Sequence, residues 1–164
     1  MSGFSNANTA RRGDDPSAAS DRSSDYLTIV IAGQMFGIPV LQIQDVLGPQ
    51  KVTRIPLAPP EVAGSLNLRG RIVTAIDVRR RLGLDAAEDG KSRNMSVVVE
   101  QEGELYSLVI DRVGDVLTLY QKDFEANPPT LDPVWRTVSL GVYRLERELL
   151  VILDVARLLG SIKT

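Results

Sequence analysis

Two aspartates, Asp77 and Asp154, come closest in type and placement to a catalytic pair. They occupy corresponding positions in two similar halves of the chain, and duplicated β domains that each supply one Asp also describe the aspartic proteases. Those enzymes hold two carboxylates that share a proton at about 3 Å, in loops whose small side chains leave room for a water molecule. Here the aspartates are followed by Val78-Arg79 and Val155-Ala156, which lead into a helical turn. The sequence favours a structural role, with a duplicated-barrel aspartate hydrolase as the alternative.

That structural role is helix capping. An Asp before a helix offers its carboxylate to the free backbone N–H groups of the first turn, and a Gly adopts the left-handed conformation that ends a helix. We expect Asp77 and Gly83 to bound one short helix. Asp154 and Gly160 are expected to bound the other.

Another stretch, Gly90-Lys91-Ser92, is similar to the end of a phosphate-binding loop. The complete motif requires a glycine at position 85, where this chain has Asp85. Glu88 and Asp89 would also repel a phosphate. No nucleotide site is expected there.

Composition excludes further classes of site. The chain has no histidine and no cysteine, which removes disulfides, the usual zinc sites and His-dependent catalysis, so we expect no catalytic residue, metal or cofactor. Lys and Arg total 19 against 21 for Asp and Glu, and no general attraction to nucleic acid is expected. The longest uninterrupted apolar run, Leu149 to Leu153, is far shorter than the ~20 residues of a membrane-spanning helix. We therefore expect a cytoplasmic protein without membrane insertion.

The elements that must position any site come from an internal duplication. The first part of one half falls on the first part of the other at a shift of 70 positions, and beyond a proline-rich connector the shift becomes 77. Glycines and aspartates match as well as apolar residues, which makes duplication a better explanation than chance. The matched pairs include Gly33 and Gly103, Asp45 and Asp115, Gly64 and Gly141, Asp77 and Asp154, and Gly83 and Gly160.

Each half is predicted to hold about five short strands and one closing helical turn. Short β segments punctuated by Gly and Pro begin at Tyr26, and units this small hide their sheet edges best as closed barrels. We expect a mainly β protein of two small barrels related by an approximate two-fold axis, at about 25–90 and 91–160, between which strands can be exchanged. Residues 1–24 are rich in Ser, Asn, Ala and Asp and are expected to form a disordered tail.

The stretch from Gly64 to Ile72, continued from Ala75 to Arg79, resembles the signature G-x-x-N-L-R-G-x-I-x-P-V-I-D-L-R of the CheW family. This family also includes the regulatory domain of the CheA kinase. The resemblance covers residues 26–160, with Thr74 in place of the usual proline and Asp45 in place of the commoner glutamate. Further matches lie at 36–39, 43–46, 55–59 and 109–113.

The resemblance implies two SH3-like five-stranded barrels within a CheW-like domain at 25–160, and an adaptor rather than an enzyme. Family members bind the signalling tips of methyl-accepting chemoreceptors and the CheA regulatory domain. The chain is accordingly expected to couple receptors to this histidine kinase in the two-component signalling of bacterial chemotaxis, recruited from the cytoplasm to membrane receptor arrays. An adaptor of a related non-flagellar chemosensory pathway is the alternative that the sequence leaves open.

The resemblance also implies a receptor-binding surface around Arg69. The residues placed there are Ile43, Asp45, Gly64, Asn67, Arg69 and Gly70. The duplication singles out part of this set, because Asn67 becomes Arg144 and Arg69 becomes Glu146, whereas the scaffold residues recur. A requirement of the fold should recur in both halves, so these residues are expected to serve a task of the first half.

Overall fold

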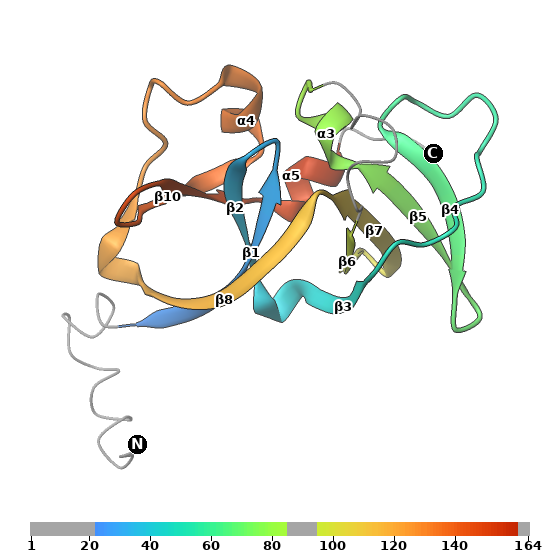
Figure 1. Ribbon diagram of the computed structural model, residues 1–164, viewed down its shortest axis with the longest axis horizontal. Coiled ribbons are helices and arrows are strands. Elements are labelled where there is room, and N and C mark those ends of the chain that lie inside the picture. Colours follow the sequence, from blue (N-terminus) through green and yellow to red (C-terminus); the bar gives the residue numbers. More distant parts are fainter. Residues whose placement is uncertain (1–21, 85–94, 161–164) are drawn as a thin grey trace, which may run out of the picture.

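The computed structural model describes residues 22–84 and 95–160, most of which lie in short strands arranged in two sheets (Figure 1). The expectation of a mainly β fold is confirmed. Most of the expected tail and the stretch Gly90-Lys91-Ser92 lie outside the described residues. Within the described ranges, no helix combines the length and the apolar character needed to span a bilayer.

The elements follow the duplication. The first half contains β1 (Ser23–Ile31), β2 (Gln34–Pro39), the 3-10 turn η1 (Val40–Gln42), β3 (Ile43–Leu47), β4 (Val62–Leu68), β5 (Arg71–Asp77) and α3 (Val78–Arg81). The second half contains β6 (Met95–Gln101), β7 (Glu104–Ile110), β8 (Arg112–Tyr120), η2 (Gln121–Asp123), β9 (Phe124–Glu125), α4 (Pro133–Thr137), β10 (Ser139–Arg144), β11 (Leu149–Leu153) and α5 (Val155–Gly160).

Strand β1 begins inside the segment that was expected to be a tail. Ser23 pairs with Tyr120, and Ser24 pairs with Leu119, at the end of β8. These two serines have no apolar side chain to bury, but backbone pairing needs only N–H and C=O groups. The first residues of β1 are therefore held by pairing with β8, which composition does not reveal.

Each sheet takes strands from both halves. Sheet A has the order β8-β1-β2-β11-β10-β9, and sheet B has the order β3-β6-β7-β5-β4. The orders correspond strand for strand when the repeat is applied, and a parallel pair joins the halves in each: β2 with β11, and β7 with β5. Each half thus gives its first hairpin to the sheet that the other half dominates, and the sheets do not follow the sequence boundary near residue 90.

The described strands do not close either sheet into a continuous ladder. In both halves, however, the segment after the third strand crosses back to the fourth. Thr53 and Ser65 exchange two backbone hydrogen bonds of 2.8 Å at β4, and β9 pairs Glu125 with Val142 of β10. The two open edges of each sheet are therefore linked by a crossing segment.

Two glycines make these crossings possible. Gly64 has φ +149° and Gly141 has φ +154°. A Cβ would lie 2.2 Å from the carbonyl oxygen of Thr53 at the first site and 2.6 Å from that of Glu125 at the second. Such approaches are forbidden to any side chain, which explains why this glycine recurs in both halves.

The core has three parts. The largest cluster draws on both sheets and includes Ile29, Phe36 and Leu108. Each sheet also encloses a smaller cluster, whose buried centres are Leu66, Val73 and Ala75 in sheet B and Tyr143, Leu150 and Ile152 in sheet A. These two triplets occupy the same positions at a shift of 77.

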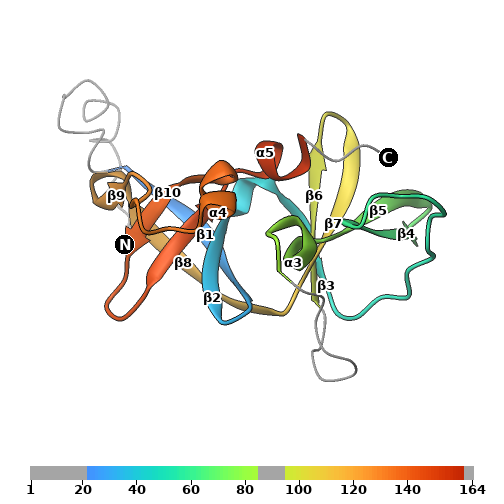
Figure 2. The same cartoon turned by 90° about the horizontal axis from the view of Figure 1, so that it is seen from above.

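Short helices lie between the two sheets, as the view in Figure 2 shows. The Nε of Arg81 in α3 donates to the carbonyl of Leu158 in α5 at 2.9 Å. The indole N–H of Trp135 in α4 donates to the carbonyl of Leu82 at 3.2 Å, and its ring meets the edge of Phe36 with centroids 5.3 Å apart. The helices thus fasten the connectors of both halves to the central core.

Candidate functional site

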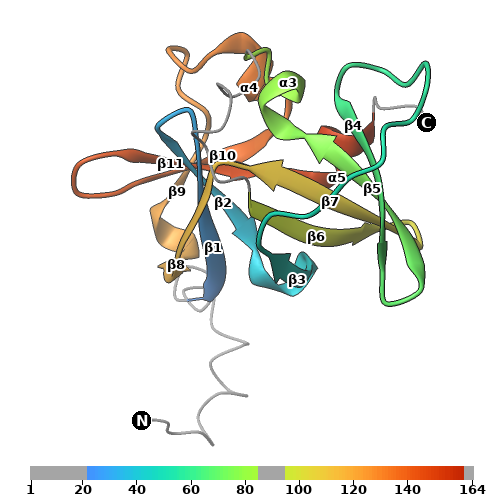
Figure 3. The same ribbon diagram turned by 45° about the vertical axis from the view of Figure 1, so that its right-hand side comes forward.

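The β4–β5 hairpin projects from sheet B, and its tip carries the residues that distinguish the first half (Figure 3). Arg69 and Gly70 form the two-residue turn and both have positive φ, at 52° and 87°, as in a type I′ turn. Asn67 Oδ1 accepts a hydrogen bond from the Gly70 N–H at 2.9 Å. Asn67 and Gly70 therefore shape the turn on which Arg69 is displayed.

Asp45 holds the Arg69 side chain in place. Nη1 of the guanidinium lies 2.9 Å from Asp45 Oδ2, while Asp45 Oδ1 accepts a hydrogen bond from the Val46 N–H at 2.8 Å. Asp45 lies on β3, at the opposite edge of sheet B from β4. The Arg69 side chain is 75% exposed, and such pairs contribute only about 0–1 kcal/mol. The ion pair therefore contributes little to stability, but it orients an exposed guanidinium whose other N–H groups face solvent.

Ile43 and Gly64 have structural surroundings. Ile43 is half-buried, pairs with Val99 of β6 and packs against the central core, and a bulge separates it from Asp45. Gly64 lies at the other end of β4, under the crossing segment. The structure thus brings together Asp45, Asn67, Arg69 and Gly70, whereas the identities of Ile43 and Gly64 are explained by packing and backbone approach.

Both aspartates cap helices. The carboxylate of Asp77 accepts from the Arg80 N–H at 3.4 Å, and that of Asp154 accepts from the Arg157 N–H at 3.2 Å. Asp154 also lies 3.3 Å from Arg157 Nε. The two carboxylates are therefore directed at the first turns of α3 and α5, respectively, rather than at a shared proton.

The two expected helix-ending glycines differ. Gly83 follows α3 with φ +80°, the left-handed conformation. Gly160 is the last residue of α5 and has no positive φ, so it does not end the helix by that route.

The corresponding hairpin tip of the second half, between β10 and β11, is built differently. Glu146 and Arg147 occupy its turn without positive φ, and the Leu145 N–H donates to the Glu148 carbonyl at 2.8 Å. Arg144, which replaces Asn67, donates instead to the Glu125 carboxylate at 2.9 Å. An ion pair like that of the first half cannot form here, because the repeat places acids at both equivalent positions.

One connection between the halves was not expected from the sequence. Arg79 of α3 donates from Nε and Nη2 to the two carboxylate oxygens of Asp111, at 2.8 and 2.7 Å, and the Ala32 N–H donates to the same carboxylate at 2.8 Å. The Arg79 hydrogen bond lowers the pKa of Asp111, and the same contact raises the pKa of Arg79. The family match at 109–113 includes Asp111, but its partner lies 32 positions away and no local pattern indicates it.

Comparison with known proteins now adds to this geometry. The model of the CheW-like domain matches residues 25–163. The chemotaxis protein CheW of Klebsiella aerogenes is 31% identical over 140 residues, which cover 84% of this chain and 82% of that protein. That of Rhizobium meliloti is 27% identical over 131 residues, covering 80% and 84%.

The chain is also similar to part of a CheA protein and to a solved structure of a CheW protein. The chemotaxis protein CheA of Salmonella typhimurium is 23% identical over 136 residues, covering 83% of this chain but 19% of that protein. The crystal structure of the scaffolding protein TtCheW from Thermoanaerobacter tengcongensis has the same fold, with a TM-score of 0.71 and 24% identity over 80% of this chain and 89% of that chain. With the family model covering nearly all the described residues, the chain belongs to the CheW family.

Proposed function

We propose that this chain is an adaptor of bacterial chemotaxis that couples methyl-accepting chemoreceptors to the CheA histidine kinase by binding both. Membership of the CheW family supports this function. The observation that carries it is the exposed Arg69 on a hairpin tip whose counterpart in the second half is Glu146. Two contacts of modest affinity gain strength in an array, because each contact raises the effective concentration for the next.

The receptor site comprises Asn67, Arg69 and Gly70 at the hairpin tip and Asp45 on β3. Ile43 and Gly64, which the resemblance also assigns to this surface, contribute through the packing of β3 and the crossing at the far end of β4. A guanidinium held by one nitrogen keeps further donors for carboxylates or carbonyls of a receptor helix. Ile72 pairs with Asn67 across the hairpin and is 70% exposed, which adds an apolar contact to the charged one. The tip therefore offers both kinds of group that a helical hairpin of the receptor needs.

The finer fold follows the family, with two SH3-like barrels in a domain of residues 25–160. Two features support it: the crossing segment that links the open edges of each sheet, and the separate cluster that each sheet encloses. In this arrangement the barrels are sheets A and B, each completed by a hairpin from the other half.

The second partner is the regulatory domain of CheA, itself a CheW-like domain. Exposed apolar side chains suit such a contact, among them Leu41 on η1 and Val116 on β8. The adaptor has no catalytic step, since both aspartates act as helix caps. It works in the cytoplasm and is recruited to receptor arrays at the membrane.

Titration with a soluble receptor signalling fragment tests the proposal. Arg69→Asn is the sharpest variant, because Asn favours positive φ and leaves the turn intact while the guanidinium is removed. Receptor binding should weaken at least about tenfold, and Arg69→Glu should weaken it further by about another tenfold. Binding to the CheA regulatory domain should stay within about twofold of wild type for both variants.

The matched control is Glu146→Arg, at the equivalent position of the second half. This charge reversal should leave receptor affinity unchanged. Wild-type receptor affinity in Arg69→Asn would reject the site, and equal losses from reversals at Arg69 and Glu146 would indicate general electrostatics instead.

A further inference from the structure

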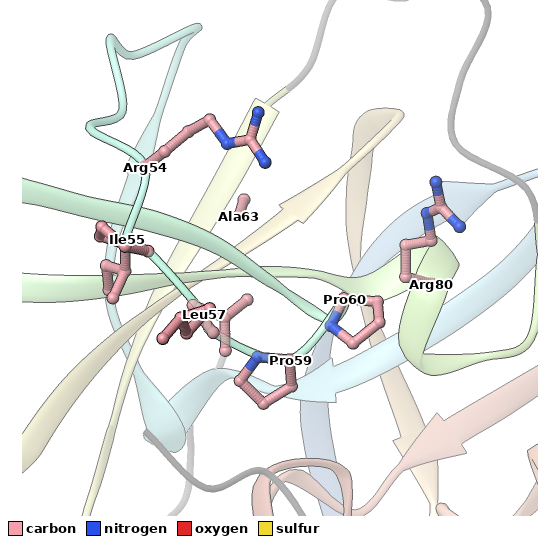
Figure 4. A pocket seen from close by; sticks show the side chains of 10 residues that line it. Arg54, Ile55, Leu57, Pro59, Pro60, Ala63 and Arg80 are labelled. Atoms are coloured by element: carbon pink, nitrogen blue, oxygen red, sulfur yellow. The ribbon is translucent and has the colours of Figure 1, made fainter.

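A hollow of about 430 Å³ lies beside the proline-rich connector, at the other end of the β4–β5 hairpin from Arg69 (Figure 4). The connector walls it on one side, and β4 and α3 complete it. The lining residues are Arg54, Ile55, Pro56, Leu57, Ala58, Pro59, Pro60, Val62, Ala63 and Arg80. Arg69 lies six positions beyond Ala63 along the extended chain, a span of about 20 Å, so the hollow is distinct from the receptor site.

The second half lacks the features that create the hollow. At a shift of 77, Ala63 becomes Leu140, a much larger side chain at the matching bulge of β10. The connector there forms α4, whose Trp135 is fastened to the core. The residues that shape the hollow are therefore specific to the first half rather than part of the shared backbone plan.

The charged residues that line the hollow are both basic. Its lining contains two arginines and no acidic residue. Within the described ranges, neither Arg54 nor Arg80 makes an ion pair, whereas Arg157, the counterpart of Arg80, lies 3.3 Å from Asp154. Figure 4 shows the two arginines on opposite sides of the hollow, with Ala63 on the side of Arg54. Two exposed guanidinium groups that flank an apolar floor complement a carboxylate with an apolar neighbour.

The connector also displays a leucine at a conformational cost. The Ala58 N–H donates to the Ile55 carbonyl at 3.3 Å, closing a turn with Pro56 and Leu57 at its centre. Leu57 has φ +63°, a conformation that favours glycine after such a proline, and its side chain is fully exposed. Strain at an exposed apolar residue is typical of recognition sites rather than of scaffold.

We propose that this hollow is a second docking site, for an acidic segment of a protein partner. A carboxylate of that segment lies between Arg54 and Arg80, and a neighbouring apolar side chain packs against Leu57. The site does not depend on the receptor contact at Arg69, because the two lie at opposite ends of one hairpin.

Binding of short labelled peptides to the full chain tests this site. The probe is a fluorescein-labelled peptide of alternating Glu and Leu, and its counterpart carries Gln in place of Glu. The acidic peptide should bind at least about tenfold more tightly, and its amide shift changes should centre on Leu57 and Ala63. Arg54→Ala and Arg80→Ala should each weaken it by about tenfold. Arg157→Ala is the matched control and should leave binding unchanged.

Leu57→Gly separates recognition from folding. Glycine relieves the positive φ, so the variant should melt at a higher temperature and yet bind the acidic peptide about tenfold more weakly. Arg69→Asn should bind the peptide as wild type does, so that failure of the receptor proposal leaves this one standing. Equal binding of the Glu and Gln peptides, no binding up to about 1 mM, or unchanged binding in Leu57→Gly would overturn the site.

Discussion

The hairpin tips of the two halves lie at opposite ends of the molecule (Figure 3). Both reverse the direction of the chain between two paired strands, but they do so with different residues and turn conformations. In the first half, positive φ at Arg69 and Gly70 gives a tight turn that presents a guanidinium. In the second half, Glu146 and Arg147 turn without positive φ, and Arg144 is held by Glu125. After the duplication the strands stayed alike, whereas the residues of the hairpin tips diverged. Residues that break the repeat therefore indicate where the two halves differ in function.

The cores of the two sheets differ in the opposite way: the residues at equivalent core positions change, but the volume that they fill together is kept. Gly37 pairs with Ile152 in sheet A, and the equivalent pair in sheet B is Ser107 with Ala75. A Cβ on Gly37 would lie 2.9 Å from Ile152 Cδ1, so the small residue makes room for the large one. Packing constrains the summed volume of two facing side chains rather than each residue. The cluster in sheet B is aliphatic, whereas that in sheet A also contains aromatic rings.

The largest expected effect tests what the halves share. Gly64→Ala and Gly141→Ala each place a Cβ against a backbone oxygen in the crossing segment. We expect each substitution to lower the free energy of unfolding by roughly 3 kcal/mol or more, measured by urea denaturation. A mild effect at either site would mean that its crossing can move aside, and the two halves would not then share this constraint.

The next effect tests a contact that the halves do not share. Asp111→Asn breaks the bidentate ion pair with Arg79. The repeat has no such pair, because Leu41 corresponds to Asp111 and Ala156 corresponds to Arg79. We expect a loss of about 2 kcal/mol near neutral pH, measured by urea denaturation, because both side chains are largely buried.

The pH dependence of this loss follows from the pKa of Asp111, which lies below its ordinary value of 3.8 when the chain is folded. Because the folded-state pKa is the lower one, the stability from the carboxylate is fully present above about pH 4 and declines as pH falls through the folded-state pKa. The difference between wild type and Asp111→Asn should therefore shrink in acid. A difference that stayed constant from pH 7 to about pH 2 would show that the charge contributes nothing.

A smaller effect sharpens the comparison of the tips. Gly70→Ala meets no atom within 4 Å but must adopt φ +87°, so it should cost about 1–2 kcal/mol. Arg147→Ala, its counterpart in a turn without positive φ, should change stability by less than about 0.5 kcal/mol. Thermal unfolding of both variants checks this, and equal costs would indicate that the two turns have the same conformation.

The smallest effect concerns the caps. Asp77→Ala and Asp154→Ala should each cost about 1 kcal/mol, whereas Asp77→Asn should be nearly neutral because Asn caps helices as well as Asp. Asp154→Asn should cost slightly more than Asp77→Asn, since it also loses the exposed pair with Arg157. Denaturation of the four variants provides the comparison, and abolished partner binding in a folded Asp77→Asn would assign its carboxylate to recognition.

Much of this could be predicted because glycines, aspartates and apolar positions repeat. That pattern identified the strands, the caps at Asp77 and Asp154, and the contrast at Arg69. The sequence allowed an exchange of strands, but which hairpins are exchanged could not be derived, because local patterns specify strands and not which half supplies their neighbours. For the same reason the partner of Asp111 could not be predicted. The hollow could not be predicted either, because it arises from the small volume of Ala63 rather than from a motif.

The exchange of hairpins also sets an order of events during synthesis of the chain. Sheet B is complete once β7 has left the ribosome at Ile110, whereas sheet A needs β11, which ends at Leu153. The β1–β2 hairpin is the first of the described hairpins to be made, but one of its edges waits for β8, which ends at Tyr120, and the other for β11, which ends at Leu153. Its exposed edges during this interval make the earliest-made hairpin the segment most in need of protection by a chaperone.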